Sequence, residues 1–539
     1  MYVDTETTGL DPRLDMLRIV SINGQAFDVW YNSDEQKARE LLEQMKDEPF
    51  VAHNAQFDLD FLAEHMGYHH QGPIFDTMVA AQMLNTGRRD ENGKTVSASL
   101  ANVVRMFLGQ EVDKTMQKAA WDGLVDDQML FYAAEDTRIL QPLHGVLLTA
   151  LKRTKLERLF KLEMQLLPVL MYAKRRGIGF DLERAKRVRD MNLKRANSMI
   201  KFISNPDLNP RSPQNVAQFF GLENSEVDTL RDYAKKTKSK DARRVMEVRK
   251  RLKKASTLEK QLISRVRKDG RIHPSFHQTF TETGRLSSRE PNLQNQDHGS
   301  DIRGLFVPDE GNRFVISDYS QLELRLAALF SRDENMLTAY GEGRDLHTET
   351  QLRIFGKPRN KDEGKTTRTL SKNINFGLVF GGGHNTLIKF AAKSGVEISE
   401  KEAKEYRDAF RDAYPTLYKW QQTQGDVRPE FVYTALGRRR YITPGEGYCT
   451  RINNIVQGSA ADGMKLACVI LYREHGIVPN LNVHDEVVVE CPSSEATGVL
   501  GVVKSTMENA MYRATKQNPK SPVVKIVAEA GIADSWAEK

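Results

Sequence analysis

Hydrophobic and polar positions follow two different patterns along the chain. From residue 1 to about 150, short apolar strands alternate with helical stretches, and a strand at the start runs into a turn at Gly9. A second apolar patch covers residues 50–53, and helical periodicity covers residues 126–151. Strands that alternate with helices are typical of an α/β domain. A helix predicted over residues 156–176 then leads into a second unit.

The second unit is predicted to be α+β. Asn-Pro and Ser-Pro turn signals between residues 205 and 213 open a basic helical region. Strands are expected near residues 313–317 and 481–490, and a mostly helical block near 333–425 lies between them. The GKT at residues 364–366 resembles part of a phosphate-binding loop, but Arg359 stands where that loop needs glycine. We therefore do not expect a phosphate-binding loop there.

The composition is that of a globular enzyme with several domains. The chain has 539 residues, of which 40% are hydrophobic and 28% charged. It contains no run of eighteen apolar residues, and its start lacks the features of a secretory signal. Cys449, Cys468 and Cys491 form no C-x-x-C pair, which favours a reducing cytoplasm over a disulfide framework or a zinc site. We expect a cytoplasmic protein that does not enter a membrane.

Positive charge is concentrated in one stretch of the chain. Residues 231–271 contain 17 Lys and Arg against 5 Asp and Glu, whereas the whole chain has a net charge of only +7. A basic stretch of this kind is either a solvated helical face or a surface that binds the phosphates of a nucleic acid. Charge alone leaves both interpretations open.

Four acidic residues near the front of the chain have a pattern that suits metal binding. Asp4 and Glu6 are two positions apart on a predicted strand, so their side chains project from the same face. Asp58 ends an N-x-x-x-D segment, and Asp136 follows Tyr132 by four positions on a predicted helix. Each acid alone is more often a surface residue. Together they would repel one another unless hard cations held them, and two such cations can promote phosphodiester hydrolysis.

Two more aspartates stand at strand ends in the second unit. Asp318 directly follows an apolar strand, and Asp485 lies between two apolar runs that read as a tight hairpin. If folding brings them together, they can bind two magnesium ions that activate a hydroxyl and neutralise a triphosphate. A triphosphate also needs cations from the protein.

A helical stripe supplies those cations. Arg368, Lys372 and Phe376 are spaced by four, so they share one helix face, and His347 is a further candidate phosphate contact. Taken alone, this spacing describes an ordinary amphipathic helix. In combination with the two aspartates it favours a nucleotide site.

These segments together resemble a known family. DYSQLELR at 318–325, RTLSKNINFG at 368–377 and VHDEV at 483–487 are similar to motifs A, B and C of family A DNA polymerases, the class of the bacterial DNA polymerase I large fragment. TGRLSSREPNLQN at 283–295 and IVQGSAAD at 455–462 match two further segments of that family. The D-x-E, N-x-x-F-D and Y-x-x-x-D segments resemble the motifs of DEDDy 3′–5′ exonucleases.

The resemblance implies a fold and a division into domains. Residues 1–150 would form a ribonuclease H-like 3′–5′ exonuclease domain, and residues 151–539 a right-hand polymerase domain. Within the latter, the thumb would cover about 185–275 and the fingers about 341–448, with the palm made from the remainder. The basic stretch would then be the thumb that grips duplex phosphates.

The resemblance also implies roles for individual residues. In the exonuclease, Tyr132 would orient the attacking water, and the metal ligands would be Asp4, Glu6, Asp58 and Asp136. In the polymerase, the metal ligands would be Asp318, Asp485 and the Tyr319 carbonyl, with Glu486 nearby and Lys372 as a proton donor to pyrophosphate. The deoxynucleotide contacts would be Tyr319, Gln321, Glu323, His347, Arg368, Lys372, Phe376 and Phe380. The DNA contacts would be Arg285, Asn292, Gln294, Asn453, Gln457, His484, Lys253 and Lys254.

One position departs from the family pattern. Phe380 stands where the family usually has a tyrosine, whose hydroxyl would hydrogen-bond Glu323. Glu323 would exclude a ribose 2′-hydroxyl by occupying its space. An unpaired buried carboxylate is costly, so Glu323 is expected to be held differently, which bears directly on sugar selection.

The sequence therefore predicts a DNA-directed DNA polymerase with a proofreading exonuclease, acting in DNA replication or repair. Two Mg²⁺ are expected in each active site, with Mn²⁺ as a substitute. The expected partners are primer-template DNA, deoxynucleoside triphosphates and a single-stranded 3′ end, and the expected state is a monomer. The compact layout resembles phage-encoded enzymes. The alternatives are a single-subunit RNA polymerase and a non-catalytic DNA-binding scaffold.

Overall fold

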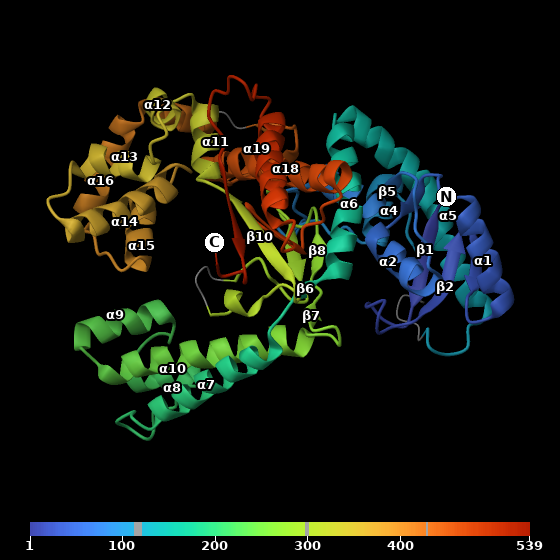
Figure 1. The fold of residues 1–539 in the computed structure, drawn as a ribbon, viewed down its shortest axis with the longest axis horizontal. Coiled ribbons are helices and arrows are strands. Elements are labelled where there is room, and N and C mark those ends of the chain that lie inside the picture. Colours follow the sequence, from blue (N-terminus) through green and yellow to red (C-terminus); the bar gives the residue numbers. More distant parts are fainter. Residues whose placement is uncertain (113–120, 297–300, 427–428, 539) are drawn as a thin grey trace.

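The computed structural model describes residues 1–112, 121–296, 301–426 and 429–538 (Figure 1). The first unit is a mixed sheet covered by helices. Its strands are β1 (Val3–Thr7), β2 (Leu17–Ile22), β3 (Gln25–Asp28), β4 (Phe50–Ala52) and β5 (Ile74–Asp76). Its helices are α1 (Asn32–Gln44), α2 (Ala55–Met66), α3 (Thr77–Asn85), α4 (Leu100–Leu108) and α5 (Asp127–Arg153). The α/β layout expected for residues 1–150 is confirmed.

The order of these strands positions the acidic residues. β1, β2 and β3 are antiparallel neighbours, β4 and β5 are parallel, and a parallel bridge from Tyr2 to Val51 joins the two groups. The order across the sheet is therefore β3-β2-β1-β4-β5. β2 is buried along its whole length, whereas β1 buries Val3 and Thr5 and turns Asp4 and Glu6 to the opposite face. This alternation follows from the two-residue period of a strand.

A long helix joins the first unit to the second. α6 (Glu157–Arg176) confirms the helix predicted over residues 156–176 and packs against both units. Beyond it, four strands form an antiparallel sheet in the order β13-β14-β10-β15. They are β10 (Asn312–Tyr319), β13 (Leu481–Val483), β14 (Glu486–Pro492) and β15 (Ala528–Ala533). The packed helices α18 (Tyr448–His475) and α19 (Ala496–Ala514) lie beside this sheet, together with α11 (Leu322–Ser331).

Two helical lobes extend from this sheet and face one another (Figure 1). One contains α7 (Leu182–Ile200), α8 (Pro213–Phe220), α9 (Val227–Thr237) and α10 (Lys240–Thr257), followed by a π-helical turn at Leu258–Leu262 and a 3-10 turn at Ile263–Arg265. The other contains α12 (Glu334–Gly341), α13 (Leu346–Phe355), α14 (Lys361–Leu378), α15 (His384–Lys393), α16 (Glu400–Ala413) and α17 (Pro415–Asp426).

Short strand pairs connect the lobes to the rest. They are β6 (Ile178–Gly179) with β7 (Arg271–Ile272), β8 (Ser275–His277) with β9 (Ser287–Arg289), and β11 (Phe431–Tyr433) with β12 (Arg439–Tyr441). A 3-10 turn covers Arg303–Leu305.

Three further expectations from the sequence can be compared with the structure. Residues 364–366 lie inside α14, which confirms that they do not form a phosphate-binding loop. The three cysteines are free thiols. Across the described ranges, no helix is both long and apolar enough to cross a membrane.

Candidate active sites

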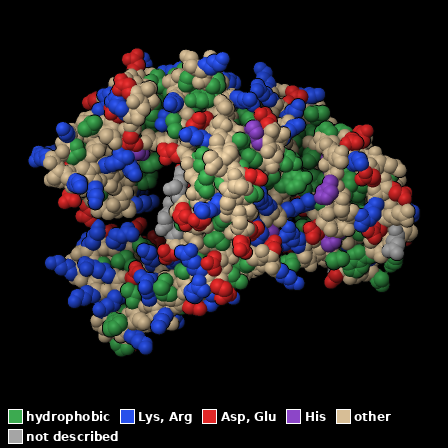
Figure 2. All heavy atoms as spheres, viewed as in Figure 1, with side chains coloured by type: hydrophobic (Ala, Val, Ile, Leu, Met, Phe, Trp, Pro, Cys, Tyr) green, Lys and Arg blue, Asp and Glu red, His purple; other side chains and the backbone are tan. Residues whose placement is uncertain are grey.

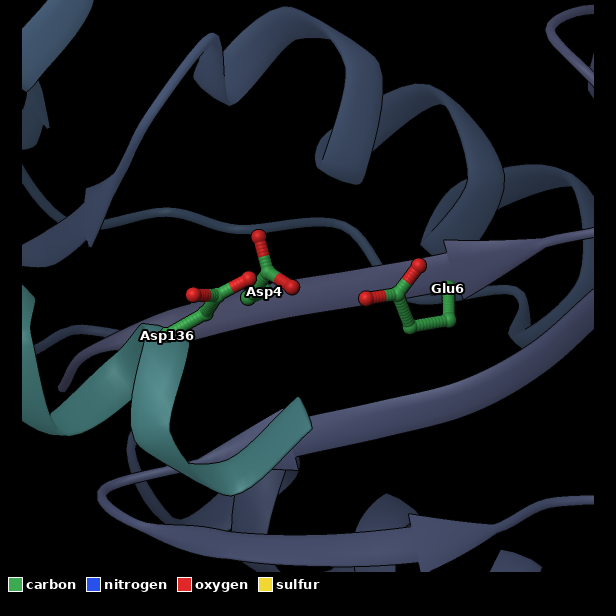
Figure 3. A group of neighbouring side chains, drawn as sticks. All are labelled: Asp4, Glu6 and Asp136. Atoms are coloured by element: carbon green, nitrogen blue, oxygen red, sulfur yellow. The ribbon is translucent and has the colours of Figure 1, made fainter. Parts of the chain in front are cut away.

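Three of the front acids meet at one point in the structure. Ligand oxygens of Asp4, Glu6 and Asp136 all lie within 4.8 Å of one another. Figure 3 shows Asp4 and Glu6 projecting from β1 toward Asp136 of α5. Carboxylate oxygens in such a group suit hard divalent cations, so the donor set fits Mg²⁺ or Mn²⁺.

The carboxyl groups of these acids have raised pKa values, because they are buried and repel one another. Burial raises the pKa of Asp4 well above its ordinary value, and the neighbouring Asp58, Glu6 and Asp136 raise it further. Burial, followed by Asp136 and Asp58, raises the pKa of Glu6 to about 8. Burial and Glu135 raise the pKa of Asp136 to about 6. A bound cation favours the ionised carboxylates and so reverses these shifts.

Asp58 and Tyr132 complete the site predicted from the sequence. Asp58 is buried on α2, where burial raises its pKa to about 8 while a hydrogen bond from Thr5 Oγ1, at 2.8 Å, opposes the shift. Tyr132 lies on α5 one turn before Asp136 and hydrogen-bonds its carboxylate. The structure thus brings all five predicted exonuclease residues into one neighbourhood.

The two polymerase aspartates also come together, through strand pairing. β10 and β14 are antiparallel, and the Tyr319 backbone N–H donates to the Asp485 carbonyl at 3.2 Å. Asp485 occupies the hairpin between β13 and β14, as expected. Burial raises its pKa to about 7, and the charge of Asp318 raises it as well. Two carboxylates that repel one another in this way are candidate ligands for a shared cation.

Two predicted residues have partners that change their roles. The Glu486 carboxylate is buried and accepts hydrogen bonds from Arg303, at 3.1 Å, and from the Trp536 indole, at 2.7 Å. It therefore anchors the sheet to the C-terminal segment. The Gln294 amide donates to the Asn482 carbonyl at 2.6 Å and accepts from the His484 backbone at 3.3 Å. The Gln294 side chain thus holds the hairpin that carries Asp485, and the DNA contact predicted for it stays a prediction.

Glu323 has a partner that sequence reasoning did not foresee. It lies on α11 and forms an ion pair with Arg285, whose segment follows β8. Arg285 also lowers the pKa of Asp485, against the larger effect of burial. The carboxylate left without a tyrosine by Phe380 is thus held by a guanidinium. Phe380 itself packs against the hydrophobic core.

The cationic stripe lies on α14 as predicted. Lys372 and Phe376 are exposed, and Phe376 lies beside His347, with 5.7 Å between ring centroids. Burial, followed by the charges of Lys372 and Arg368, lowers the pKa of His347 to about 4. The Asn375 amide donates to His347 Nδ1 at 2.8 Å, which leaves the Nε2–H of the neutral ring as a donor.

Asp345 is a residue of this site that sequence reasoning missed. Its carboxylate pairs with Arg368 at 2.7 Å, accepts from the amide of Gln321 and caps α13 through the Thr348 backbone at 2.8 Å. These donors hold its pKa below the ordinary value, although burial acts in the opposite direction. The N-cap position before α13 was the available signal in the sequence. Asp345 fixes the orientation of Arg368.

The remaining predicted DNA contacts lie on several elements. Asn453 and Gln457 are half-buried and one turn apart on α18, and His484 is exposed at the Asp485 hairpin. The Asn292 side chain accepts from the Gln294 backbone at 3.0 Å. α18 approaches the Thr283 backbone closely at Gly458, where an added Cβ would lie 3.2 Å from the Thr283 carbonyl.

Basic side chains cover the α7–α10 lobe (Figure 2). Lys253 is exposed, whereas Lys254 pairs with Asp301 at 2.6 Å. Arg249 donates to the carbonyls of Pro210 and Ser225, both at 2.7 Å, so its charge serves the lobe itself. Only part of the positive charge of residues 231–271 is therefore available to an external phosphate backbone.

Comparison with known families agrees with this arrangement. Residues 182–538 match the model of DNA polymerase family A, and residues 1–152 match a 3′–5′ exonuclease model. The chain belongs to DNA polymerase family A. It is a DNA-directed DNA polymerase of this family with a 3′–5′ exonuclease domain in front, as the sequence predicts.

Individual relatives support this membership. The family A chain is 30% identical to DNA polymerase I of Aquifex aeolicus, with 100% of this chain and 96% of that protein aligned. It is also 30% identical to DNA polymerase I of Borreliella burgdorferi, where the alignment covers 94% of this chain but only 60% of the longer relative. It is 37% identical to the thermostable DNA polymerase I of Thermus aquaticus in an alignment that covers 50% of this chain and 32% of that protein.

A solved structure has the same fold. The POL domain of Pol1 from M. smegmatis, solved in complex with DNA primer-template and dNTP, superimposes with a TM-score of 0.83 at 24% sequence identity. The similarity covers 99% of the family A chain and 95% of that structure. The right-hand polymerase fold expected for the second unit is confirmed. Enzymes of these two classes depend on divalent metal ions, in agreement with the acidic group at Asp4, Glu6 and Asp136.

Proposed function

We propose that this polymerase extends a DNA primer at its 3′ end and removes mispaired nucleotides at its second site. The observation that supports this most directly is the presence of two separate acidic centres, one at Asp318 and Asp485 and one at Asp4, Glu6 and Asp136. Mg²⁺ is the proposed physiological ion, two in each centre. Bound there, it would supply charge neutralisation and an activated oxygen nucleophile.

The polymerase residues are proposed to act mainly by positioning. Arg368, Lys372 and the Nε2–H of His347 would hold the triphosphate oxygens, and Phe376 would pack against the nucleotide. Lys372, exposed on α14, would donate a proton to the departing pyrophosphate. The Tyr319 carbonyl would assist the two aspartates. The Tyr319 hydroxyl donates to the Met507 carbonyl at 2.5 Å, so the side chain is held in the core.

The lobes are proposed to be the parts of a hand. The α7–α10 lobe would be the thumb on duplex phosphates and the α12–α17 lobe the fingers, with Arg285, Asn453, Gln457 and His484 near the primer end. We propose a monomer in the cytoplasm whose partners are primer-template DNA, deoxynucleoside triphosphates and a single-stranded 3′ end.

A single assay tests both activities. The protein is incubated with a labelled primer annealed to a longer template, with Mg²⁺ and either with or without the four deoxynucleoside triphosphates. We expect primers to lengthen when nucleotides are present and to shorten when they are absent, and chelation of the metal should stop both. A parallel reaction with the four ribonucleoside triphosphates tests the RNA polymerase alternative, which faster extension with ribonucleotides would favour. The absence of both lengthening and shortening would favour the scaffold.

Sugar selection is expected to depend on Glu323 more than on Phe380. Glu323→Ala should raise the ratio of ribonucleotide to deoxynucleotide incorporation at least about tenfold, because a steric clash of this kind costs about 1–3 kcal/mol. Phe380→Tyr should change that ratio by less than about threefold, because Arg285 already holds the carboxylate. Single-nucleotide incorporation kinetics measure both. A large improvement in selectivity from Phe380→Tyr would show that the Arg285 pair does not replace the tyrosine hydroxyl.

A further inference from the structure

One short segment of the chain connects the two active sites. At one end, His277 lines a small cavity together with Asn54 and Gln56, at the start of the helix that carries Asp58. At the other end, Arg285 pairs with Glu323 and acts on the pKa of Asp485. Eight residues span at most about 26–29 Å, so the cavity beside the exonuclease helix and the Arg285–Glu323 pair lie no farther apart than this.

The segment is held firmly on both sides of Phe280. The Gln278 amide donates to the Glu163 carbonyl at 2.6 Å, and the Thr279 hydroxyl donates to the amide oxygen of Gln82. The Glu282 carboxylate accepts from Arg89 and Arg440. An exposed side chain here is therefore not the result of a loosely packed loop.

Phe280 projects outward from this anchored segment. Its side chain is 58% exposed, whereas every other residue from 271 to 288 is buried or half-buried. The Arg289 guanidinium lies 4.2 Å from the centroid of the Phe280 ring, and the His277 ring centroid is 6.3 Å away. Isolated exposed apolar residues are common. An aromatic ring flanked by a guanidinium and an imidazole between two DNA sites is a more specific arrangement.

Phe280 lines two cavities that share part of their walls. One has a volume of about 340 Å³, is lined by α3, by α4 and by residues 279–282, and the other is the small cavity beside Asn54. Both are lined by Gln82, Thr279 and Phe280.

The cavity walls do not repel an anionic strand. Most of the lining is neutral and polar or apolar, and its two acids are Glu282 and Asp76. Glu282 is paired with two arginines, and Asp76 accepts hydrogen bonds from the backbone amides of Asn54, Ala55, Met78 and Val79. A phosphodiester backbone placed here would meet no unpaired carboxylate among these residues.

We propose that Phe280, with Arg289 and His277 beside it, is a stacking platform for the unpaired 3′ end of a primer as that end passes from the polymerase site to the exonuclease site. Stacking of a base on an aromatic ring is worth about 1–3 kcal/mol and tolerates every base, which suits a strand whose sequence is arbitrary. The platform favours the frayed end over the paired end, because an unpaired base can swing out of the duplex to meet the ring, whereas a paired terminal base is held on its template partner. This inference rests on the proposed proofreading function.

The first test compares three reactions of the same protein. Phe280→Ala should slow excision from a primer with three mispaired 3′ nucleotides about tenfold, since the loss of one stack is worth about that much. Extension of a matched primer should stay unchanged. Hydrolysis of the p-nitrophenyl ester of thymidine 5′-phosphate, a single nucleotide with no unpaired strand to be guided, should also stay unchanged. Phe280→Tyr should retain wild-type excision and Phe280→Leu should not. Tyr31→Ala, which removes an aromatic with 59% exposure elsewhere on the exonuclease domain, is the matched control.

A second test does not depend on nuclease activity. In the Asp4→Ala/Glu6→Ala background, a 2-aminopurine at the mispaired 3′ end should lose fluorescence on binding when Phe280 is present, and should lose less with Phe280→Ala. If the wild-type protein quenches the 2-aminopurine but degrades no DNA, the proofreading function is refuted and the role of Phe280 as a stacking platform stands. Equal quenching by the two proteins, or excision of mispaired primers by Phe280→Ala at the wild-type rate, would overturn the platform.

Discussion

Replacing Asp485 by alanine is expected to abolish primer extension while single-strand degradation continues. Asp485 and Asp318 carry the negative charge of the polymerase site, and burial, together with the charge of Asp318, raises the pKa of Asp485 to about 7. Charge stabilisation at such a centre is worth several kcal/mol, so extension should fall at least about a thousandfold. Time courses of single-nucleotide addition, at saturating deoxynucleotide and Mg²⁺, measure this loss.

Degradation of a single-stranded oligonucleotide by the same preparation shows whether the protein is folded. A thermal melting temperature within a few degrees of wild type supports the same point. Glu310→Ala, which removes an exposed acid just before β10, is the matched control and should extend primers normally. Extension by the Asp485→Ala protein at even a few per cent of the wild-type rate would mean that another carboxylate supports the reaction. Glu486 is not suited to replace Asp485 as a metal ligand, because its carboxylate already accepts hydrogen bonds from Arg303 and Trp536.

The parts of the site that the sequence predicted well are local in the chain. Asp4 with Glu6, and Tyr132 with Asp136, are placed on one face by the period of a strand or a helix, and this period can be read directly from the sequence. The cationic stripe on α14 is local in the same sense. Strand-end positions for Asp318 and Asp485 follow from the apolar runs beside them. Their proximity depends on the β10–β14 register, which the family resemblance supplied.

The partners that decide the roles of these residues could not be read in this way. Asp345 meets Arg368 across 23 positions, and Gln294 meets the Asp485 hairpin across 188. Glu163 of α6 forms a buried cluster with Arg438 and Lys465, which lie about 300 residues away. Such contacts come from tertiary packing, and no periodicity encodes them. The ion pair between Arg285 and Glu323, which replaces the hydrogen bond of the missing tyrosine, also comes from tertiary packing.

The double substitution Asp4→Ala/Glu6→Ala is expected to remove 3′–5′ degradation and to leave primer extension intact. Two of the three carboxylates that converge at this point would be lost, and with them the charge that would hold the divalent ions. The rate of single-strand degradation should fall at least about a thousandfold. Quenched-flow or gel assays on a labelled oligonucleotide measure it. Glu40→Ala/Glu43→Ala, on the outer surface of α1, is the matched control.

The pKa shifts add a second, independent expectation for this variant. Burial, followed by the charges of the neighbouring acids Asp58 and Asp136, raises the pKa values of Asp4 and Glu6. Above about pH 4.5 the folded protein without metal therefore binds more protons than the unfolded chain. The ionisation of Asp4 and Glu6 therefore destabilises the metal-free fold increasingly as the pH rises toward 8. Removing both should leave the metal-free melting temperature at pH 8 unchanged or higher, and should eliminate the stabilisation that Mg²⁺ gives to this domain in the wild type. Persistent degradation, or a Mg²⁺-dependent stabilisation equal to that of the wild type, would show that Asp58 and Asp136 suffice to hold the ions. The division of labour between the two acidic centres would then have to be redrawn around those two residues.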